Sequence, residues 1–281
     1  MESPFKEQYS EWYRLYSDGM SAREIATIYG RGVTTVARVI ARAGISRSAG
    51  EAARLRDELR TKNDPRPEYH YFDNIDSEEK AYWLGMLLAD GSVSYTKGAY
   101  SVTFKLKEED AYMVERLANT FNTSTKRVAS KINGIVFPAR VCHLNSKYLC
   151  NRLIELGVRP RKSVTGRADV FDNISEELMP PFLRGLIDGD GSLYIRGDGR
   201  RCAISIYGSI HIVQRIKEEL LKLGINNNKV VKNTSIYMTA WAKYSDLAKI
   251  IHYLYDNPNI YLTRKYDIAQ RILGIIGGDC E

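Results

Sequence analysis

Two aspartates, Asp90 and Asp190, each stand directly before a glycine at the end of an apolar, helix-like segment. A helix C-terminus already carries partial negative charge, and two carboxylates brought together repel each other. A divalent cation bound between the carboxylates would offset both the unfavourable helix-end charge and their mutual repulsion. All-oxygen ligands favour Mg²⁺. Metal ions held at a phosphate activate water and stabilise the leaving oxygen, so the pair predicts Mg²⁺-dependent phosphodiester chemistry.

The two segments share a glycine that could bring the aspartates together. Residues 83–91 read WLGMLLADG and residues 183–191 read LRGLIDGDG, with Gly85 and Gly185 at the same position. Glycine has no Cβ, so two such helices could pack with their backbones unusually close. A single Asp-Gly helix end would be an ordinary turn. Its repetition predicts one metal site at a helix interface.

The same order of elements follows each aspartate. Strand-like alternation, a helical stretch, renewed alternation and a closing helix follow in turn. The predicted fold class is α+β, with αββαββα repeats over residues 76–170 and 171–281, related by a pseudo-twofold axis. Internal symmetry of this kind suits a nearly twofold ligand such as double-stranded DNA, and we expect a monomer.

The N-terminal part, residues 1–62, is predicted to be a small all-helical DNA-binding domain, joined by a Pro-containing linker over residues 63–75. The spacing of Ala26, Gly30 and Val36 fits a helix-turn-helix, and the segment resembles that of resolvases and related phage proteins. A purely structural three-helix bundle is the alternative. The second helix and the following arm would offer the DNA Thr34, Thr35, Arg38, Arg42 and Arg47.

Charge and composition narrow the class of partner. The net charge is +7, and residues 119–169 hold ten Lys or Arg against two acids, which favours nucleic acid. The four cysteines show no paired or CxxC spacing, and the histidines have no metal-ligand spacing, which disfavours zinc or HNH-type nucleases. No apolar run could span a membrane, so a cytoplasmic place, or wherever the host DNA resides, is expected.

The two motifs resemble those of LAGLIDADG homing endonucleases, and LGVRPRKS at 156–163 resembles the intein-type branch. The likeness runs from about Asp76 to Gly274 and implies that the last acid of each motif binds metal. The backbone carbonyls of the preceding residues would assist, and a lysine would lie near each acid. Carried over, these positions are Asp90, Asp190, Ala89 and Gly189 for the metal and Lys162 and Lys265 as catalytic lysines.

The resemblance also implies that the strands form a saddle over the major groove. Glu108 falls where the family often has a polar active-site residue, and its counterpart would be Gly208. Base and phosphate contacts are expected from polar residues in and beside the strands. The candidates are Ser94, Thr96, Ser101, Thr103, Lys105, Lys107, Lys126, Arg127, Lys131, Arg140, Arg196, Arg200 and Arg201.

The leading hypothesis is a mobile-element homing endonuclease that makes a Mg²⁺-dependent staggered break in a long DNA target. One alternative is a non-catalytic DNA-binding regulator of the WhiA type, in which a helix-turn-helix joins a decayed body. A second is an intron RNA maturase, although a helix-turn-helix favours duplex DNA. Retention of both Asp90 and Asp190 argues for the nuclease.

Overall fold

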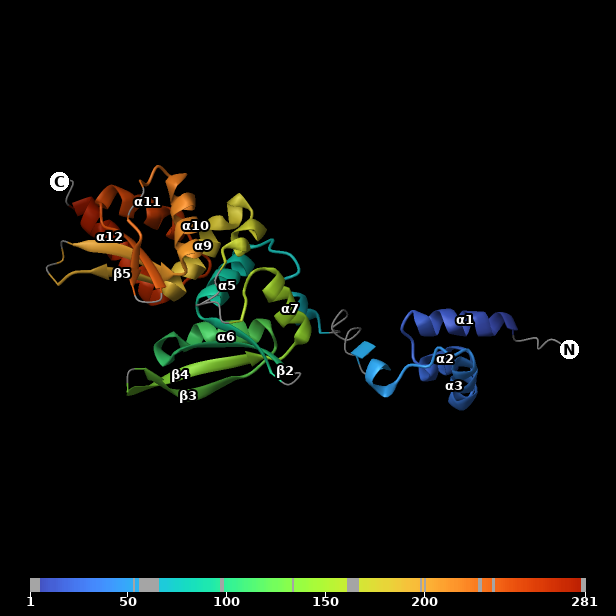
Figure 1. Ribbon diagram of the computed structural model, residues 1–281. Coiled ribbons are helices and arrows are strands. Elements are labelled where there is room, and N and C mark those ends of the chain that lie inside the picture. Colours follow the sequence, from blue (N-terminus) through green and yellow to red (C-terminus); the bar gives the residue numbers. More distant parts are fainter. Residues whose placement is uncertain are drawn as a thin grey trace. The chain divides into compact units, whose positions relative to one another are not determined.

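The computed structural model (Figure 1) describes residues 6–52, 54–55, 66–96, 99–132, 134–160, 167–197, 199, 201–226, 229–233 and 236–278. The chain divides into two compact units, Met1–Pro65 and Arg66–Glu281. Among the described residues, no helix combines the length and apolar character needed to cross a bilayer.

The N-terminal unit contains the helices α1 (Lys6–Ser17), α2 (Ala22–Ile28) and α3 (Val33–Arg42). They enclose a small core of Trp12, Ile25, Ala26, Val36 and Ile40. The turn between α2 and α3 places Gly30 at φ +60°, a left-handed conformation that favours glycine. Residues 45–48 have no regular structure, and helix resumes at residue 49.

A capping box begins α2. The Ser21 hydroxyl accepts a hydrogen bond from the Glu24 backbone N–H, and the Glu24 carboxylate accepts one from the Ser21 backbone N–H. These two bonds satisfy donors that a helix start otherwise leaves unpaired. They fix where the chain enters α2.

The second unit contains two repeats of the same element order. The first comprises α5 (Glu78–Ala89), β1 (Gly91–Thr96), β2 (Ala99–Lys107), α6 (Ala111–Thr120), β3 (Thr125–Ile132), β4 (Ile135–Leu144) and α7 (Lys147–Glu155). The second comprises α9 (Met179–Asp190), β5 (Gly191–Ile195), β6 (Cys202–Gly208), α10 (Ile210–Leu221), β7 (Val231–Asn233), β8 (Ile236–Trp241) and α11 (Tyr244–Tyr255). The predicted α+β class and αββαββα order are confirmed, and a further helix, α12 (Thr263–Gly278), follows the second repeat.

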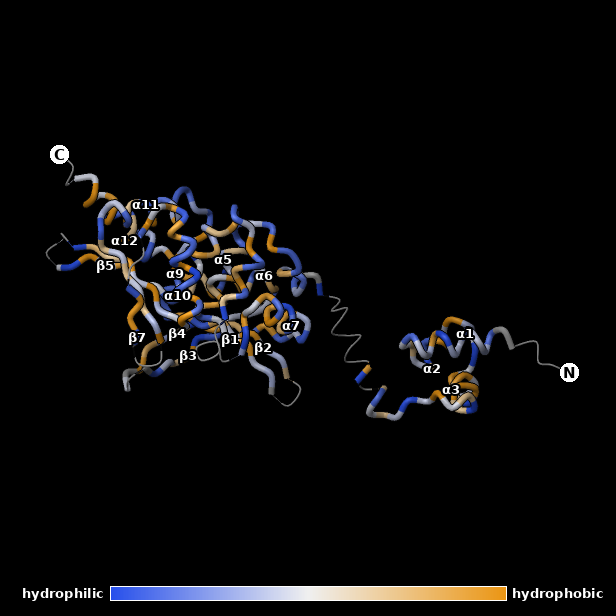
Figure 2. The backbone as a smooth tube through the Cα atoms, turned by 45° about the horizontal axis from the view of Figure 1, so that its top comes forward, coloured by the Kyte–Doolittle hydropathy of each residue, from blue (hydrophilic) through white to orange (hydrophobic). Residues whose placement is uncertain are grey.

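The two antiparallel sheets have equivalent strand orders, β1-β2-β4-β3 and β5-β6-β8-β7. Their register also agrees, because Gly91 pairs with Phe104 in one sheet and Gly191 with Ile206 in the other. In each sheet one face packs on helices and buries residues such as Phe104 and Ile206 completely. In Figure 2 the strands β1 to β4 and β7 extend to one side of the helices of this unit.

Candidate active site

The helices α5 and α9 cross at their glycines. A Cβ on Gly85 would lie 2.1 Å from the Phe182 carbonyl oxygen, and a Cβ on Gly185 would lie 2.1 Å from the Tyr82 carbonyl oxygen. The two contacts are reciprocal, since each glycine faces the residue three places before the other. Only glycine permits this approach, so the close packing predicted for these two helices is confirmed.

The same crossing brings the ends of the two motifs together. Asp90 caps α5, and Asp190 is the last residue of α9. A Cβ on Gly189 would lie 2.2 Å from the Ala89 Cβ and 3.2 Å from Asp90 Oδ2. The Asp90 carboxylate therefore lies over the backbone immediately before Asp190, and two acids from different repeats meet at one place.

This arrangement fits a divalent cation with few protein ligands. Among the described residues, no group of three or more His, Cys, Asp or Glu side chains could hold a metal. Mg²⁺ is commonly bound through one or two carboxylates while it keeps several waters. Asp90 and Asp190, with the backbone carbonyls of Ala89 and Gly189, supply oxygen donors of that kind. The missing Gly189 side chain leaves the space that the Ala89 side chain occupies, with the Asp90 carboxylate beside it.

Lys265, one of the two predicted lysines, lies beneath this end of α9. Its ammonium group is buried and donates to the backbone carbonyls of Ile187 at 2.7 Å, Asp188 at 2.5 Å and Gly191 at 2.6 Å. Burial lowers the pKa of Lys265 to about 8, while Asp188 and the two motif-terminal acids, Asp90 and Asp190, act in the opposite direction. Each of the three ammonium N–H groups has a carbonyl acceptor. Lys265 thus places a positive charge close to both acids and holds the helix end in position.

Asp188 is the buried acid of the second motif. Its carboxylate accepts hydrogen bonds from Tyr82 Oη at 2.8 Å, Tyr255 Oη at 2.6 Å and the Leu262 backbone N–H at 2.8 Å. Burial raises the pKa of Asp188, and these three donors together with Lys265 oppose the rise. The equivalent residue of the first repeat is Leu88, which is also buried. Asp188 consequently ties α9 to α5, to α11 and to the segment that leads into α12.

Arg184 reinforces the same connection one turn earlier on α9. Its guanidinium group donates to the backbone carbonyls of Ile260 at 2.8 Å and Leu254 at 2.6 Å, and it forms an ion pair with Glu78. Glu78 also accepts from the Asn259 backbone N–H at 2.9 Å. The segment before α12 is thereby fixed at several points, which determines where Lys265 is placed.

Sequence reasoning did not identify Arg184, Tyr82 and Tyr255 as contributors to this site. A charged residue inside the otherwise apolar FLRGLI segment was the available signal, because a buried arginine needs acceptors for its five N–H groups. The identity of those acceptors depends on a segment some seventy residues further along the chain.

The predicted DNA contacts of the first repeat divide between the two faces of its sheet. Cross-strand partners share a face and neighbours along a strand alternate. Lys105 pairs with Val141 and Val141 with Lys126, so these lie on the face opposite the helix-covered Phe104. Ser94, Ser101, Thr103 and Lys107 fall on this same open face. Arg127, Lys131 and Arg140 fall on the other face by register.

Both arginines of that set, Arg127 and Arg140, are engaged within the protein. Arg140 donates to Glu108 at 2.6 Å and lies 3.7 Å from Glu115, and Arg127 lies 3.7 Å from Glu108. Glu108, which was expected near the active centre, is therefore an ion-pair partner at the end of β2. Gly208, its expected counterpart, pairs with Tyr237 in the second sheet and corresponds by register to Leu106, not to Glu108.

Other candidates lie outside this arrangement. Arg196 and Arg201 are exposed and flank the β5–β6 connection, where the Arg196 backbone N–H donates to the Arg201 carbonyl at 2.8 Å. Lys162, Arg200 and the side chain of Thr96 lie outside the residues that the structure describes.

In the N-terminal unit the predicted contact residues behave in two ways. The exposed side of α3 carries Thr34, Thr35, Arg38 and Arg42. Arg47 instead stacks on the Tyr16 ring, 4.1 Å from its centroid, and donates to the Gly19 and Met20 carbonyls at 3.3 and 3.2 Å. Arg47 closes the unit onto itself, in contrast to the free arm expected from the sequence.

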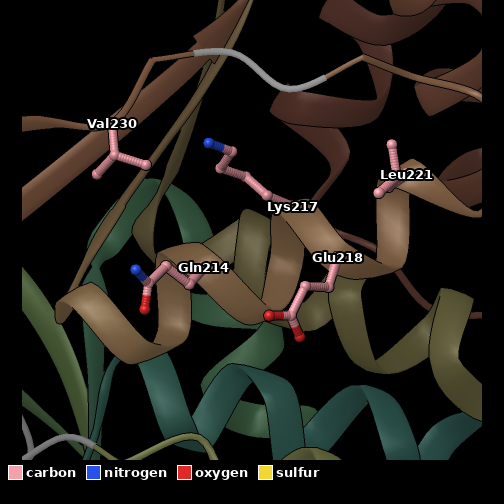
Figure 3. A pocket seen from close by; sticks show the side chains of 5 residues that line it. All are labelled: Gln214, Lys217, Glu218, Leu221 and Val230. Atoms are coloured by element: carbon pink, nitrogen blue, oxygen red, sulfur yellow. The ribbon is translucent and has the colours of Figure 1, made fainter.

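A surface pocket lies on the second repeat, along α10 and the residues before β7 (Figure 3). It is lined by Gln214, Lys217, Glu218, Leu221 and Val230. None of these residues belongs to the motif helices. The opposite charges of Lys217 and Glu218 favour no particular ligand.

No protein-family model and no curated protein matches the sequence. Solved structures do. The homing endonuclease I-WcaI bound to its DNA recognition sequence has a TM-score of 0.52 and 15% identity, over 69% of this chain and 87% of that chain. I-SmaMI bound to uncleaved DNA in the presence of calcium ions has a TM-score of 0.47 and 16% identity, over 71% and 92%. The LAGLIDADG homing endonuclease I-GzeII in complex with its DNA target has a TM-score of 0.47 and 14% identity, over 71% and 91%. The second unit thus has the LAGLIDADG homing endonuclease fold.

Proposed function

We propose that this chain is a site-specific homing endonuclease that makes a Mg²⁺-dependent, staggered double-strand break in a long DNA target. The meeting of Asp90 and Asp190 at the glycine-packed end of α5 and α9 carries the proposal. Two carboxylates from different repeats at one point suit a substrate with two strands to cut. The fold found in I-WcaI supports the same conclusion.

The residues of the site have distinct roles. Asp90 and Asp190, with the carbonyls of Ala89 and Gly189, would hold the metal, which when bound supplies an activated water and stabilises the leaving oxygen. Lys265 would contribute positive charge near the scissile phosphate. Its ammonium N–H groups already donate to three backbone carbonyls, so it would stabilise the phosphate by its charge and not by a direct hydrogen bond. Lys162 is the corresponding candidate of the first repeat.

DNA binding would use both units. The open face of the first sheet carries Lys105, Lys107 and Lys126, which suit phosphate contacts. The exposed side of α3 suits a major groove, as in a helix-turn-helix. A second DNA-binding unit on the same chain would lengthen the recognised site and raise its effective concentration at the target. A monomer with internal pseudo-twofold symmetry can then match an imperfectly palindromic sequence.

The test is cleavage of DNA that carries the uninterrupted insertion locus, with and without Mg²⁺. We expect wild type to cut and both Asp90→Asn and Asp190→Asn to lose cutting while they still bind. Asp267→Asn, at an exposed position on α12, is the matched control and should cut like wild type. Tight binding of this DNA without cutting by wild type would favour the DNA-binding regulator and overturn the nuclease. Preferential binding of intron RNA would favour the maturase.

A further inference from the structure

The two sheets have matching registers but carry different chemistry on their open faces. In the first sheet, one row across β2, β4 and β3 consists of Lys105, Val141 and Lys126. At the same register of the second sheet, the row across β6, β8 and β7 consists of Tyr207, Met238 and Val231. Two exposed lysines are thus replaced by a tyrosine and by a valine that is 45% exposed.

The neighbouring rows show the same contrast. Ser94 of β1 corresponds to Tyr194 of β5, which is 46% exposed, and His143 of β4 corresponds to Ala240 of β8. Among the described strand residues of the second sheet, none on the open face is charged. Lys232 falls on the opposite face by register.

These faces would contact DNA by different means. Lysine is a compact, strongly hydrated charge that positions a protein on phosphate without reading sequence. Apolar and aromatic side chains contact the C5-methyl group of thymine, which lies exposed in the major groove. Val231, Met238 and the ring edges of Tyr194 and Tyr207 form such a surface.

Resting on the proposed function, we propose that the two halves of the DNA target are recognised by different chemistry. The half under the first sheet is held by lysine–phosphate contacts. The half under the second sheet is recognised through thymine methyl groups, by Tyr194, Tyr207, Val231 and Met238. Specificity is therefore greater, and salt dependence smaller, in the second half.

The first experiment tests the thymine contacts. Full-length protein without divalent cation selects binders from a pool of randomised duplexes, and the enriched site is made with deoxyuridine in place of thymidine in one half or the other. Uracil pairs like thymine but lacks the methyl group. We expect substitution in one half to weaken binding about tenfold for two lost methyl contacts, and substitution in the other half to have no effect. Equal sensitivity of both halves, or of neither, would overturn the inference. Absence of any enriched duplex would instead refute the proposed function.

Reciprocal exchanges assign each half to its sheet. Lys105→Tyr with Lys126→Val should flatten the slope of log affinity against log salt by about two and leave the uracil effect intact. Tyr207→Lys with Val231→Lys should steepen that slope by about two and reduce the uracil effect, because only Tyr194 and Met238 of the four methyl-contacting residues remain. Circular dichroism and urea unfolding identify any exchange that fails to fold, and the single variants then replace it. Well-folded exchanges that leave both the slope and the uracil effect unchanged would contradict the proposal.

Discussion

Replacing Asp188 by leucine, the residue that the first repeat has at position 88, tests how the second motif is supported. The Tyr82 hydroxyl, the Tyr255 hydroxyl and the Leu262 backbone N–H would all lose their acceptor in a buried place. Each unpaired buried donor costs about 1–3 kcal/mol, and removal of a desolvated carboxylate offsets part of the sum. We expect Asp188→Leu to lower the free energy of unfolding of the second unit by about 4 kcal/mol.

A compensated variant separates the lost hydrogen bonds from the change of side-chain shape. Adding Tyr82→Phe and Tyr255→Phe to Asp188→Leu removes two of the three unpaired donors. The combined variant should recover about half of the lost stability, since replacing both partners by apolar groups is nearly neutral. The three substitutions are therefore expected to be strongly non-additive.

Urea unfolding followed by tryptophan fluorescence measures these changes. A Trp12→Phe background leaves Trp83 and Trp241, which both belong to the second unit, as the reporters. Asp267→Leu, on the exposed side of α12, serves as the surface control and should stay within about 0.5 kcal/mol of wild type. Two results would contradict the reasoning: unfolding of Asp188→Leu at the same urea midpoint as wild type, or a combined variant that is less stable than Asp188→Leu. Either would show that the hydrogen bonds to the Asp188 carboxylate do not stabilise the second unit.

Two further predictions concern packing and thiol reactivity. Gly85→Ala and Gly185→Ala should each destabilise the second unit by about 3 kcal/mol or more in urea unfolding, and by similar amounts because their contacts are reciprocal. Gly274→Ala is the control, since a Cβ there would meet nothing within 4 Å, and it should leave the stability unchanged. Tolerance of alanine at either crossing position would refute the close approach of the helices. Burial raises the pKa of Cys142 to about 11 and of Cys150 to about 12. Both thiols should therefore resist iodoacetamide at pH 8 in the native protein and react in urea, which peptide mass spectrometry can follow. Rapid labelling of the native protein would show instead that the two thiols are accessible.

The parts of the site that depend on local pattern were predictable from sequence. Gly85 and Gly185 predict a close helix crossing, because only a residue without a Cβ permits it. Asp90 and Asp190 follow these glycines at the same spacing. Each strand pattern likewise indicates its element. The repeat order follows from these signals.

The remaining features depend on contacts between distant segments. The engagement of Lys265 with three carbonyls follows from the anchoring of the segment before α12 by Arg184 and Asp188, and no local pattern encodes that. The predicted contacts Lys126 and Arg127 are adjacent in one strand, so they cannot share a face. The sequence alone does not say which of them faces the helices, and the structure places Arg127 on that side.

Because the two sheets share the same register, a row of cross-strand residues in one sheet can be exchanged for the equivalent row of the other. A row such as Tyr207, Met238 and Val231 can be transplanted to the positions of Lys105, Val141 and Lys126 without moving a backbone hydrogen bond, because the ladders beneath them coincide. The glycine crossing imposes the opposite condition, since a change in one helix displaces the other. Gene duplication followed by divergence would leave this pattern. The open face of each sheet could change independently, whereas the crossing of α5 and α9 had to be kept by both copies. Chimeras that exchange rows of residues while retaining both motif helices are the natural route to altered preference.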